Sequence, residues 1–218
     1  MCDTCNNYFA RKVEKPFLQH PAIYMLRHEQ RLPNKRGFIP AARGVLLPNI
    51  PVTLQPYTGG RMSELEIPPE HVPTFLTRKH DTLILPHDMD PPEGAVVSRF
   101  LAKAALETFA SRILDDPEWR ESLVDEPQLD LLRNHARRGT DPKWPYHSRQ
   151  VYDADHVDAD GMQIVHEFLL LTTEYDEWYF ILALFGTEYA LNMGGPEIDG
   201  YIAWLEANEG KSPLYTAR

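Results

Sequence analysis

The sequence predicts an α+β protein that has an antiparallel sheet and one long core helix. Three regions carry this prediction. Residues 94–114 have the clearest helical spacing of apolar side chains, and residues 149–193 hold several runs rich in Val, Ile, Leu, Tyr and Phe, as strands do. Between residues 37 and 92, ten prolines separate short β-type runs, which favours short strands and loops over a regular barrel.

The chain is expected to begin with two short helices. Residues 6–19 place apolar side chains on one side of an amphipathic helix, and Pro16 is expected to break this helix near its end. A second helix is predicted over residues 22–30, after the turn at Pro21. Short strands are expected farther on, over residues 44–47, 52–54, 74–77 and 82–85.

A long helix over residues 94–114 is the expected core element. Its apolar residues recur three and four positions apart, so they line one face, and Gly94 and Asp115 mark its limits. A second amphipathic helix is predicted over residues 128–139, because basic side chains in its last turn and Gly139 after it are typical of a helix end.

The antiparallel sheet is expected in the last third of the chain. Four runs there are typical of strands in a meander. They cover residues 149–152, 163–173, 177–186 and 188–193. A last helix is predicted over residues 196–210, because Pro196 suits the first turn of a helix and Gly210 suits its end.

Charge divides the sequence into a basic beginning and an acidic remainder. Residues 1–43 contain eight of the 22 basic and three of the 32 acidic side chains, so their charge is +5 in a chain of net charge −10. Residues 44–218 then carry −15. We therefore expect two domains, 1–43 and 44–218, the first of which contacts nucleic acid such as DNA. A chance cluster of basic side chains on a solvated face is the alternative.

Hydropathy and cysteine content predict a cytoplasmic protein. No apolar run reaches the about 18 residues that a membrane helix needs, and the first residues lack the basic-then-apolar pattern of a signal peptide. The two cysteines of the chain lie three positions apart, which makes them poor material for a disulfide framework. Metal binding and redox chemistry are the uses that a reducing compartment favours.

Cys2 and Cys5 form a CxxC motif, which supplies two of the four ligands that structural zinc takes. The nearest histidines are His20 and His28, and they lie farther apart than the about three to five positions of a zinc finger. A thioredoxin-like redox site needs a strand before the motif, and only one residue precedes Cys2. Half of a zinc site and a pair of cysteines without metal therefore both remain open.

The stretch CDTCNNYFARKVEKPFL resembles the second half of an HNH endonuclease of the group that carries a four-cysteine zinc site, in which a CxxCN knuckle leads into a helix. Downstream, segments such as RFLAKAALE, LDLLRNHARRG and QIVHEFLLLTT resemble the C-terminal region that accompanies this element in bacterial members of the family. The resemblance spans nearly the whole chain. It implies that the first residues are the rear half of a ββα-metal element.

The resemblance implies roles for six side chains. Cys2 and Cys5 match the second pair of structural zinc ligands, and Asn6 stands where many of these enzymes have a ligand to the catalytic Mg²⁺ or Mn²⁺. Asn6 is alternatively a helix cap. Basic side chains of the following helix are expected to contact nucleic-acid phosphates, and these are Arg11, Lys12 and Lys15.

The sequence departs from the family at the general base. In the family's mechanism a histidine activates the water that attacks the phosphodiester, and no residue here matches that histidine or the first CxxC. We therefore expect an endonuclease-like protein for metal-dependent hydrolysis of DNA that is truncated or degenerate in this chain, with the missing motifs encoded upstream of Met1. The alternatives are a non-catalytic accessory protein that binds nucleic acid or protein, and a globular domain without metal. A homodimer is expected where two CxxC motifs share one zinc ion.

Overall fold

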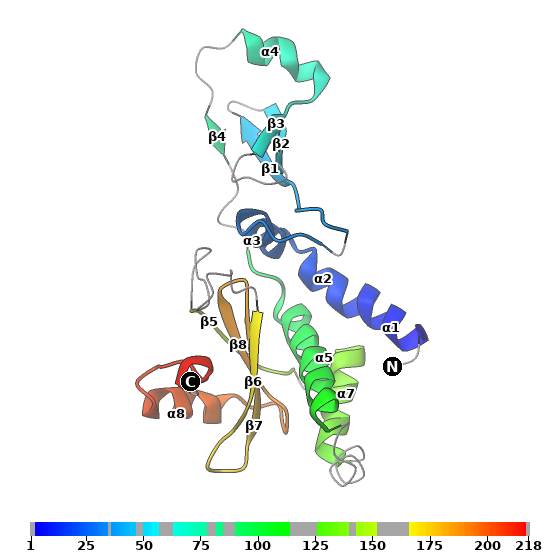
Figure 1. Cartoon of the computed structure of the whole chain (residues 1–218). Coiled ribbons are helices and arrows are strands. Elements are labelled where there is room, and N and C mark those ends of the chain that lie inside the picture. Colours follow the sequence, from blue (N-terminus) through cyan, green and yellow to red (C-terminus); the bar gives the residue numbers. More distant parts are fainter. Residues whose placement is uncertain are drawn as a thin grey trace. The chain divides into compact units, whose positions relative to one another are not determined.

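The computed structural model describes residues 3–34, 36–46, 50–56, 63–77, 82–84, 90–113, 126–139, 143–151 and 166–216. Helices and antiparallel sheets are both present, which confirms the predicted α+β class (Figure 1). The chain forms two compact units, residues 1–17 with 92–218 and residues 18–91. The expected domains 1–43 and 44–218 rest on charge and remain a prediction.

The larger unit contains a four-stranded antiparallel sheet in the order β5-β8-β7-β6. Its strands are β5 (His147–Gln150), β6 (His166–Thr172), β7 (Trp178–Leu184) and β8 (Thr187–Asn192). Strands β6, β7 and β8 pair in chain order, as the meander prediction requires, and β5 adds to the free edge of β8. The antiparallel pairing and the meander of the last three strands are therefore confirmed, but the expected place of the first strand is wrong, because β5 pairs with β8 and not with β6.

Strands β7 and β8 are joined by a two-residue turn at Phe185 and Gly186. Both residues have positive φ angles, 52° and 88°, as a type I′ hairpin turn requires. This turn matches the twist of the flanking strands, and it pairs Leu184 directly with Thr187. The register of the two most buried strands is thus set by local geometry.

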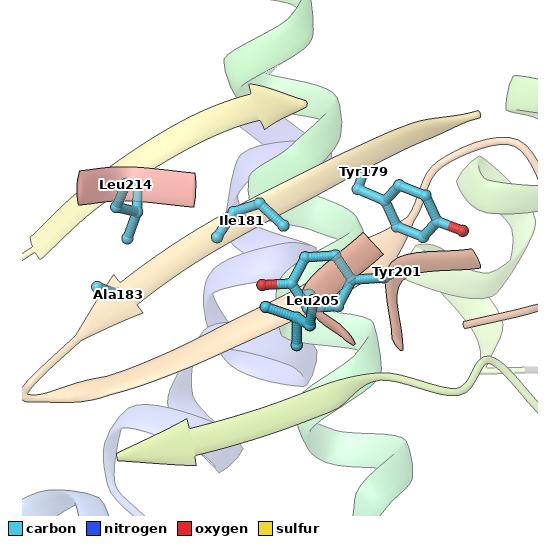
Figure 2. Packing of buried hydrophobic residues seen from close by; sticks show 7 residues of the cluster. Tyr179, Ile181, Ala183, Tyr201, Leu205 and Leu214 are labelled. Atoms are coloured by element: carbon cyan, nitrogen blue, oxygen red, sulfur yellow. The ribbon is translucent and has the colours of Figure 1, made fainter. Parts of the chain in front are cut away.

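Strand β7 is buried on both faces. One face packs against helix α8 (Asp199–Ala207) and the short helix α9 (Pro213–Thr216). The residues of this cluster include Tyr179, Ile181, Ala183, Tyr201, Leu205 and Leu214 (Figure 2). The other face meets helix α5 (Gly94–Ile113), where the rings of Phe109 and Trp178 lie 5.6 Å apart. A strand covered on both sides needs a continuous apolar run, and this is what residues 178–184 supply.

The expected long core helix is confirmed as α5, which begins at Gly94 and has seven buried residues. It packs against α7 (Pro127–Arg138), and Ser98 Oγ lies 2.9 Å from His135 Nε2 between the two helices. Helix α7 ends as expected. Gly139 adopts a left-handed conformation with φ of 65° and donates its N–H to the carbonyl of His135.

The last helix begins later than the sequence indicates. Pro196 does not open it, because α8 starts at Asp199. The carboxamide of Asn192 accepts a hydrogen bond from the N–H of Gly194, which keeps the chain in a bend after β8. The first helical carbonyl is that of Ile198, which accepts from the N–H groups of Tyr201 and Ile202. Among the described residues, no helix is both long and apolar enough to span a bilayer.

A continuous helix opens the chain. It consists of α1 (Asp3–Phe9), a π-helical segment η1 (Ala10–Glu14) and α2 (Lys15–Leu18). It begins before the expected start at residue 6. Pro16 does not break it, because the wider π turn comes just before the proline, and Lys15 donates to the carbonyl of Ala10 five positions back. Within the larger unit, Phe17 is fully buried and stacks on Phe100 with ring centroids 4.2 Å apart.

The smaller unit has its own sheet, in the order β3-β2-β1-β4. Its strands are β1 (Ala42–Leu46), β2 (Ile50–Pro56), β3 (Ser63–Glu66) and β4 (Leu83–Ile84). The predicted helix after Pro21 is confirmed as α3 (Pro21–Glu29), whose buried His28 contacts the carbonyl oxygen of Pro40 through Nδ1 at 2.7 Å. Leu46, Ile50 and Val52 form the centre of the apolar core of the smaller unit.

The prediction of a strand over residues 74–77 is wrong. A 3-10 turn, η2 (Pro69–His71), leads into helix α4 (Val72–Leu76) there. Prolines at positions 69 and 73 fall in the first turns of these helices. The N–H groups of a first turn have no partner within the helix, so a proline there costs no hydrogen bond. The prolines therefore favour helix in spite of the β propensity of Thr and Phe. Strand β3 was not expected, because its sequence SELE carries one apolar residue in four.

Replacing Gly186 with alanine is expected to destabilise the larger unit. The residue has φ of 88°, and a Cβ there costs about 1–2 kcal/mol. Urea unfolding of the full chain, followed by circular dichroism, measures this change. Gly195→Ala is the control, because its added Cβ meets no atom within 4 Å and its φ is not positive. Equal unfolding midpoints for the two variants would contradict the assigned turn.

Candidate functional site

The predicted site residues lie together on the first helix. Cys5 and Asn6 belong to α1, Arg11 and Lys12 belong to η1, and Lys15 begins α2. Cys2, the sixth predicted residue, lies outside the described residues. One continuous helix therefore carries all of the predicted positions that the structure describes.

Asn6 is not a helix cap. Helix α1 begins at Asp3, so Asn6 stands inside its first turns, and its side chain is exposed. The alternative reading of this residue as a cap is therefore wrong. Its predicted role as a ligand of a catalytic cation remains a prediction.

The described part of the chain does not contain a complete set of metal ligands in one place. Cys5 lies in α1 and is partly exposed. Across the described residues, no group of three or more His, Cys, Asp or Glu side chains is placed to hold a metal ion. These residues do not by themselves fit the four ligands of structural zinc, so the zinc half-site at Cys2 and Cys5 remains a prediction.

The first helix has one buried side and one basic side. Val13 and Phe17 are 2% and 0% exposed, and they anchor the helix to the larger unit. The side chains on its solvent side include three exposed cations, Arg11, Lys12 and Lys15. None of the three has an ion-pair partner among the described residues. Three cations at spacings of one, three and four positions form a small basic surface that suits phosphate groups.

Glu14, which lies between these cations in the sequence, is paired with a lysine of another helix. Glu14 Oε1 lies 2.7 Å from Lys103 Nζ of α5, which also contacts Glu107. Burial lowers the pKa of Lys103, but the hydrogen bonds that it donates to Glu107 and Glu14, together with their negative charges, outweigh this effect, and the net pKa is raised. Lys103 therefore stays protonated, and its charge offsets the negative charge of Glu14.

A second cluster of ionisable groups surrounds Glu188 in β8, whose side chain is fully buried. Its Oε1 accepts from Arg149 Nε at 2.7 Å and from the hydroxyl of Tyr201 at 2.9 Å, and its Oε2 accepts from the hydroxyl of Ser212. Arg149 also donates to the carbonyl of Gly210. The carboxylate of β8 thus accepts hydrogen bonds from side chains of β5, of α8 and of the residue just before α9.

Burial raises the pKa of Tyr201, and the neighbouring Glu188 charge raises it further, so the phenol remains a hydrogen-bond donor. His147 lies beside it with ring centroids 5.7 Å apart. Burial lowers the pKa of His147, and the charge of Arg149 lowers it further, so this imidazole is neutral at pH 7. Both oxygens of Glu188 are occupied by donors of the protein, which assigns the cluster a structural role.

An acidic pocket of about 290 Å³ lies at the opposite end of β7 and β8. It is lined by Leu129, Asp176, Glu177, Trp178, Asn192, Met193, Gly194, Gly195 and Glu197. Glu177 is held there by the hydroxyl of Tyr179 at 3.2 Å. Three carboxylates around one opening repel a polyanion, so this pocket does not suit a nucleic-acid backbone.

The smaller unit has a pocket of about 550 Å³ beside α3 and strands β1 and β2. Its lining residues are Gln19, Pro21, Tyr24, Met25, Ala41, Ala42, Arg43 and Thr53. Arg43 is the one charged residue among them. The sequence held no motif for either pocket, because each is lined by residues that are distant along the chain.

Replacing Glu188 with alanine is expected to destabilise the larger unit by about 3–5 kcal/mol, because it leaves Arg149 without its buried partner. Urea unfolding at pH 7 measures the loss. Glu209→Ala is the matched control, since Glu209 forms an exposed ion pair with Lys211 that contributes about 0–1 kcal/mol. A loss for Glu188→Ala no greater than that of the control would contradict the structural role.

Comparison with protein-family models, with curated proteins and with solved structures found no match to this chain. The functional conclusion therefore depends on the residues of the chain and their geometry.

Proposed function

We propose that this chain is a DNA-binding protein of the HNH endonuclease type, and that it contacts the DNA backbone through the basic surface formed by Arg11, Lys12 and Lys15. The observation that carries the proposal is the two-sided first helix. Its apolar side is fixed to the protein by Val13 and Phe17, while its three cations are exposed.

Each cation has a role that follows from its chemistry. Arg11 presents a planar guanidinium that can donate two parallel hydrogen bonds to one phosphate. Lys12 and Lys15 are compact charges on long stems, so they reach phosphates on either side. Such contacts fix the position of a protein on a duplex but do not read its sequence.

The acidic remainder of the chain supports this assignment. Residues 44–218 carry −15 and are repelled by DNA, whereas residues 1–43 carry +5. A local cluster of cations attracts DNA even in a chain whose net charge is negative. The net charge of −10 therefore opposes non-specific binding of DNA to the surface as a whole, but it does not prevent DNA from contacting the basic surface.

The proposed reaction is metal-dependent hydrolysis of a phosphodiester. Cys2 and Cys5 supply two thiolates for structural zinc, and the amide oxygen of Asn6 is a suitable ligand for Mg²⁺ or Mn²⁺. When bound, such a cation stabilises the charge that develops on the phosphate and the leaving oxygen. The remaining zinc ligands and the general base must come from another segment or from a second copy of the chain.

The second candidate is a non-catalytic accessory protein that holds nucleic acid. The same observation favours it, because the basic surface lies wholly within this chain and needs no other segment. The two candidates share the contact with DNA and differ in cleavage.

Charge reversal at the basic surface is expected to weaken DNA binding at least tenfold. The variant is Arg11→Glu, Lys12→Glu, Lys15→Glu, and the measurement is fluorescence anisotropy with a labelled 20-base-pair duplex at 50–200 mM salt. Each lost phosphate contact should reduce the slope of log K against log salt by about 0.9. The matched control reverses Arg112, Lys143 and Lys211, which are also exposed and change the net charge equally. The proposal is overturned if the two variants bind alike, or if the native chain does not bind.

Cleavage distinguishes the two candidates. Supercoiled plasmid is incubated with the full chain and Mg²⁺ or Mn²⁺, with EDTA in a parallel reaction. Metal-dependent nicking that Asn6→Ala reduces is expected of the endonuclease. Binding without nicking is expected of the accessory protein. Nicking that persists in EDTA contradicts the metal-dependent reaction and points to a contaminating activity.

A further inference from the structure

We infer that the DNA-binding surface continues from the first helix onto the C-terminal turn of α7, where Arg137 and Arg138 contact the sugar-phosphate backbone of the same duplex. This inference rests on the proposed function. It adds a second element of the larger unit, far away in the sequence, to the surface that Arg11, Lys12 and Lys15 form.

Tyr8 joins the two elements. Its hydroxyl donates a hydrogen bond to the carbonyl oxygen of Arg137, and the guanidinium of Arg137 lies 6.0 Å from the centroid of its ring. This distance is at the limit of a cation–π contact. Lys12 follows Tyr8 by four positions, about one helical turn. Tyr8 thus brings the first helix, which carries Lys12, against the C-terminal turn of α7, which carries Arg137.

Arg99 of α5 holds the end of α7 in place. Its Nη2 donates to the carbonyl of Arg137 at 2.7 Å, and its Nε donates to the carbonyl of Ala136 at 3.3 Å. Nη2 also lies 3.4 Å from the Tyr8 hydroxyl. Gly139 makes this approach feasible, because a Cβ at that position would lie 2.7 Å from Arg99 Cδ.

Arg99 also removes an electrostatic obstacle. The C-terminal end of a helix carries a partial negative charge, which repels phosphate. A guanidinium that donates to the last carbonyls neutralises this charge. Arg137 and Arg138 are then exposed beside a neutralised helix end, and neither has an ion-pair partner in the described part of the chain.

Two acidic side chains of these helices are paired with cations, and Asp3 lies farther away along the sequence, at the start of α1. Glu14 is paired with Lys103, and Asp130 is paired with Arg133 toward the beginning of α7. Five exposed cations remain on two helices, namely Arg11, Lys12, Lys15, Arg137 and Arg138. A duplex carries about one negative charge per 1.7 Å of its axis, so two neighbouring helices can engage several of its phosphates at once.

The test removes the charges of α7 while keeping the first helix intact. The variant Arg137→Gln, Arg138→Gln is compared with the native full chain in the anisotropy assay, using two duplexes of unrelated sequence. Binding is expected to weaken equally for both duplexes, and the salt slope is expected to fall by about 1.8, which corresponds to two phosphate contacts. Arg137→Lys, Arg138→Lys keeps the charge and is expected to retain the native slope.

The matched control is Arg112→Gln, Lys143→Gln, which removes two exposed charges from other elements of the larger unit. Circular dichroism of each variant confirms that it is folded. The inference is overturned if the α7 variant binds with the affinity and slope of the control while charge reversal of the first helix still weakens binding; the proposed function then stands alone. It is also overturned if the α7 arginines bind anionic vesicles or an acidic peptide but contribute nothing to duplex binding. Failure of the native chain to bind any duplex overturns both.

Discussion

Strand β7 is apolar on both faces, and the need to keep both faces from water determines the arrangement of the larger unit. Tyr179 and Ile181 point to the side of α8 and α9, and the alternate residues point to the side of α5. Burying each large side chain contributes about 1.5–3 kcal/mol, more than any surface interaction in the unit. The buried Glu188 serves the same packing. Its carboxylate accepts hydrogen bonds from Arg149, Tyr201 and Ser212, so these polar groups are satisfied where α8 and α9 cover the sheet.

The basic surface is a consequence of this packing. Phe17 stacks on Phe100 of α5 and contacts the ring of Tyr189 of β8 edge-on, so the first helix is fixed to the side of the sheet opposite α8. Phe9, Val13 and Phe17 recur every four positions, whereas four residues of an α-helix overshoot a full turn by about 40°. The π-helical segment takes up part of this excess and keeps Val13 and Phe17 on the buried side. Arg11 and Lys15 are thereby directed to solvent.

Local patterns predicted the elements whose signals are local. Apolar spacing located α5, runs rich in Val, Ile, Leu, Tyr and Phe located β6 to β8, and Gly139 located the end of α7. The strand predicted at Pro73 was wrong because proline chemistry there outweighs β propensity, and the helix start predicted at Pro196 was wrong because Asn192 keeps the following chain in a bend. The contact of Tyr8 with Arg137 could not be predicted, because the two residues are 129 positions apart. Neither segment has a sequence pattern that indicates which other segment it packs against. The cations of the first helix could be identified from the sequence, but not the second helix that lies beside them.

The first helix differs from a flexible basic arm in its thermodynamics. A disordered arm must lose backbone freedom of about 1–2 kcal/mol per residue when it binds DNA, which offsets much of its electrostatic attraction. Here the backbone is ordered by Val13, Phe17 and the Glu14–Lys103 pair before any ligand arrives. Only the long side chains of the cations remain to be ordered. Such a surface keeps more of its Coulomb energy as affinity, and it presents its charges in a fixed spacing that favours a regular polyanion over an irregular one.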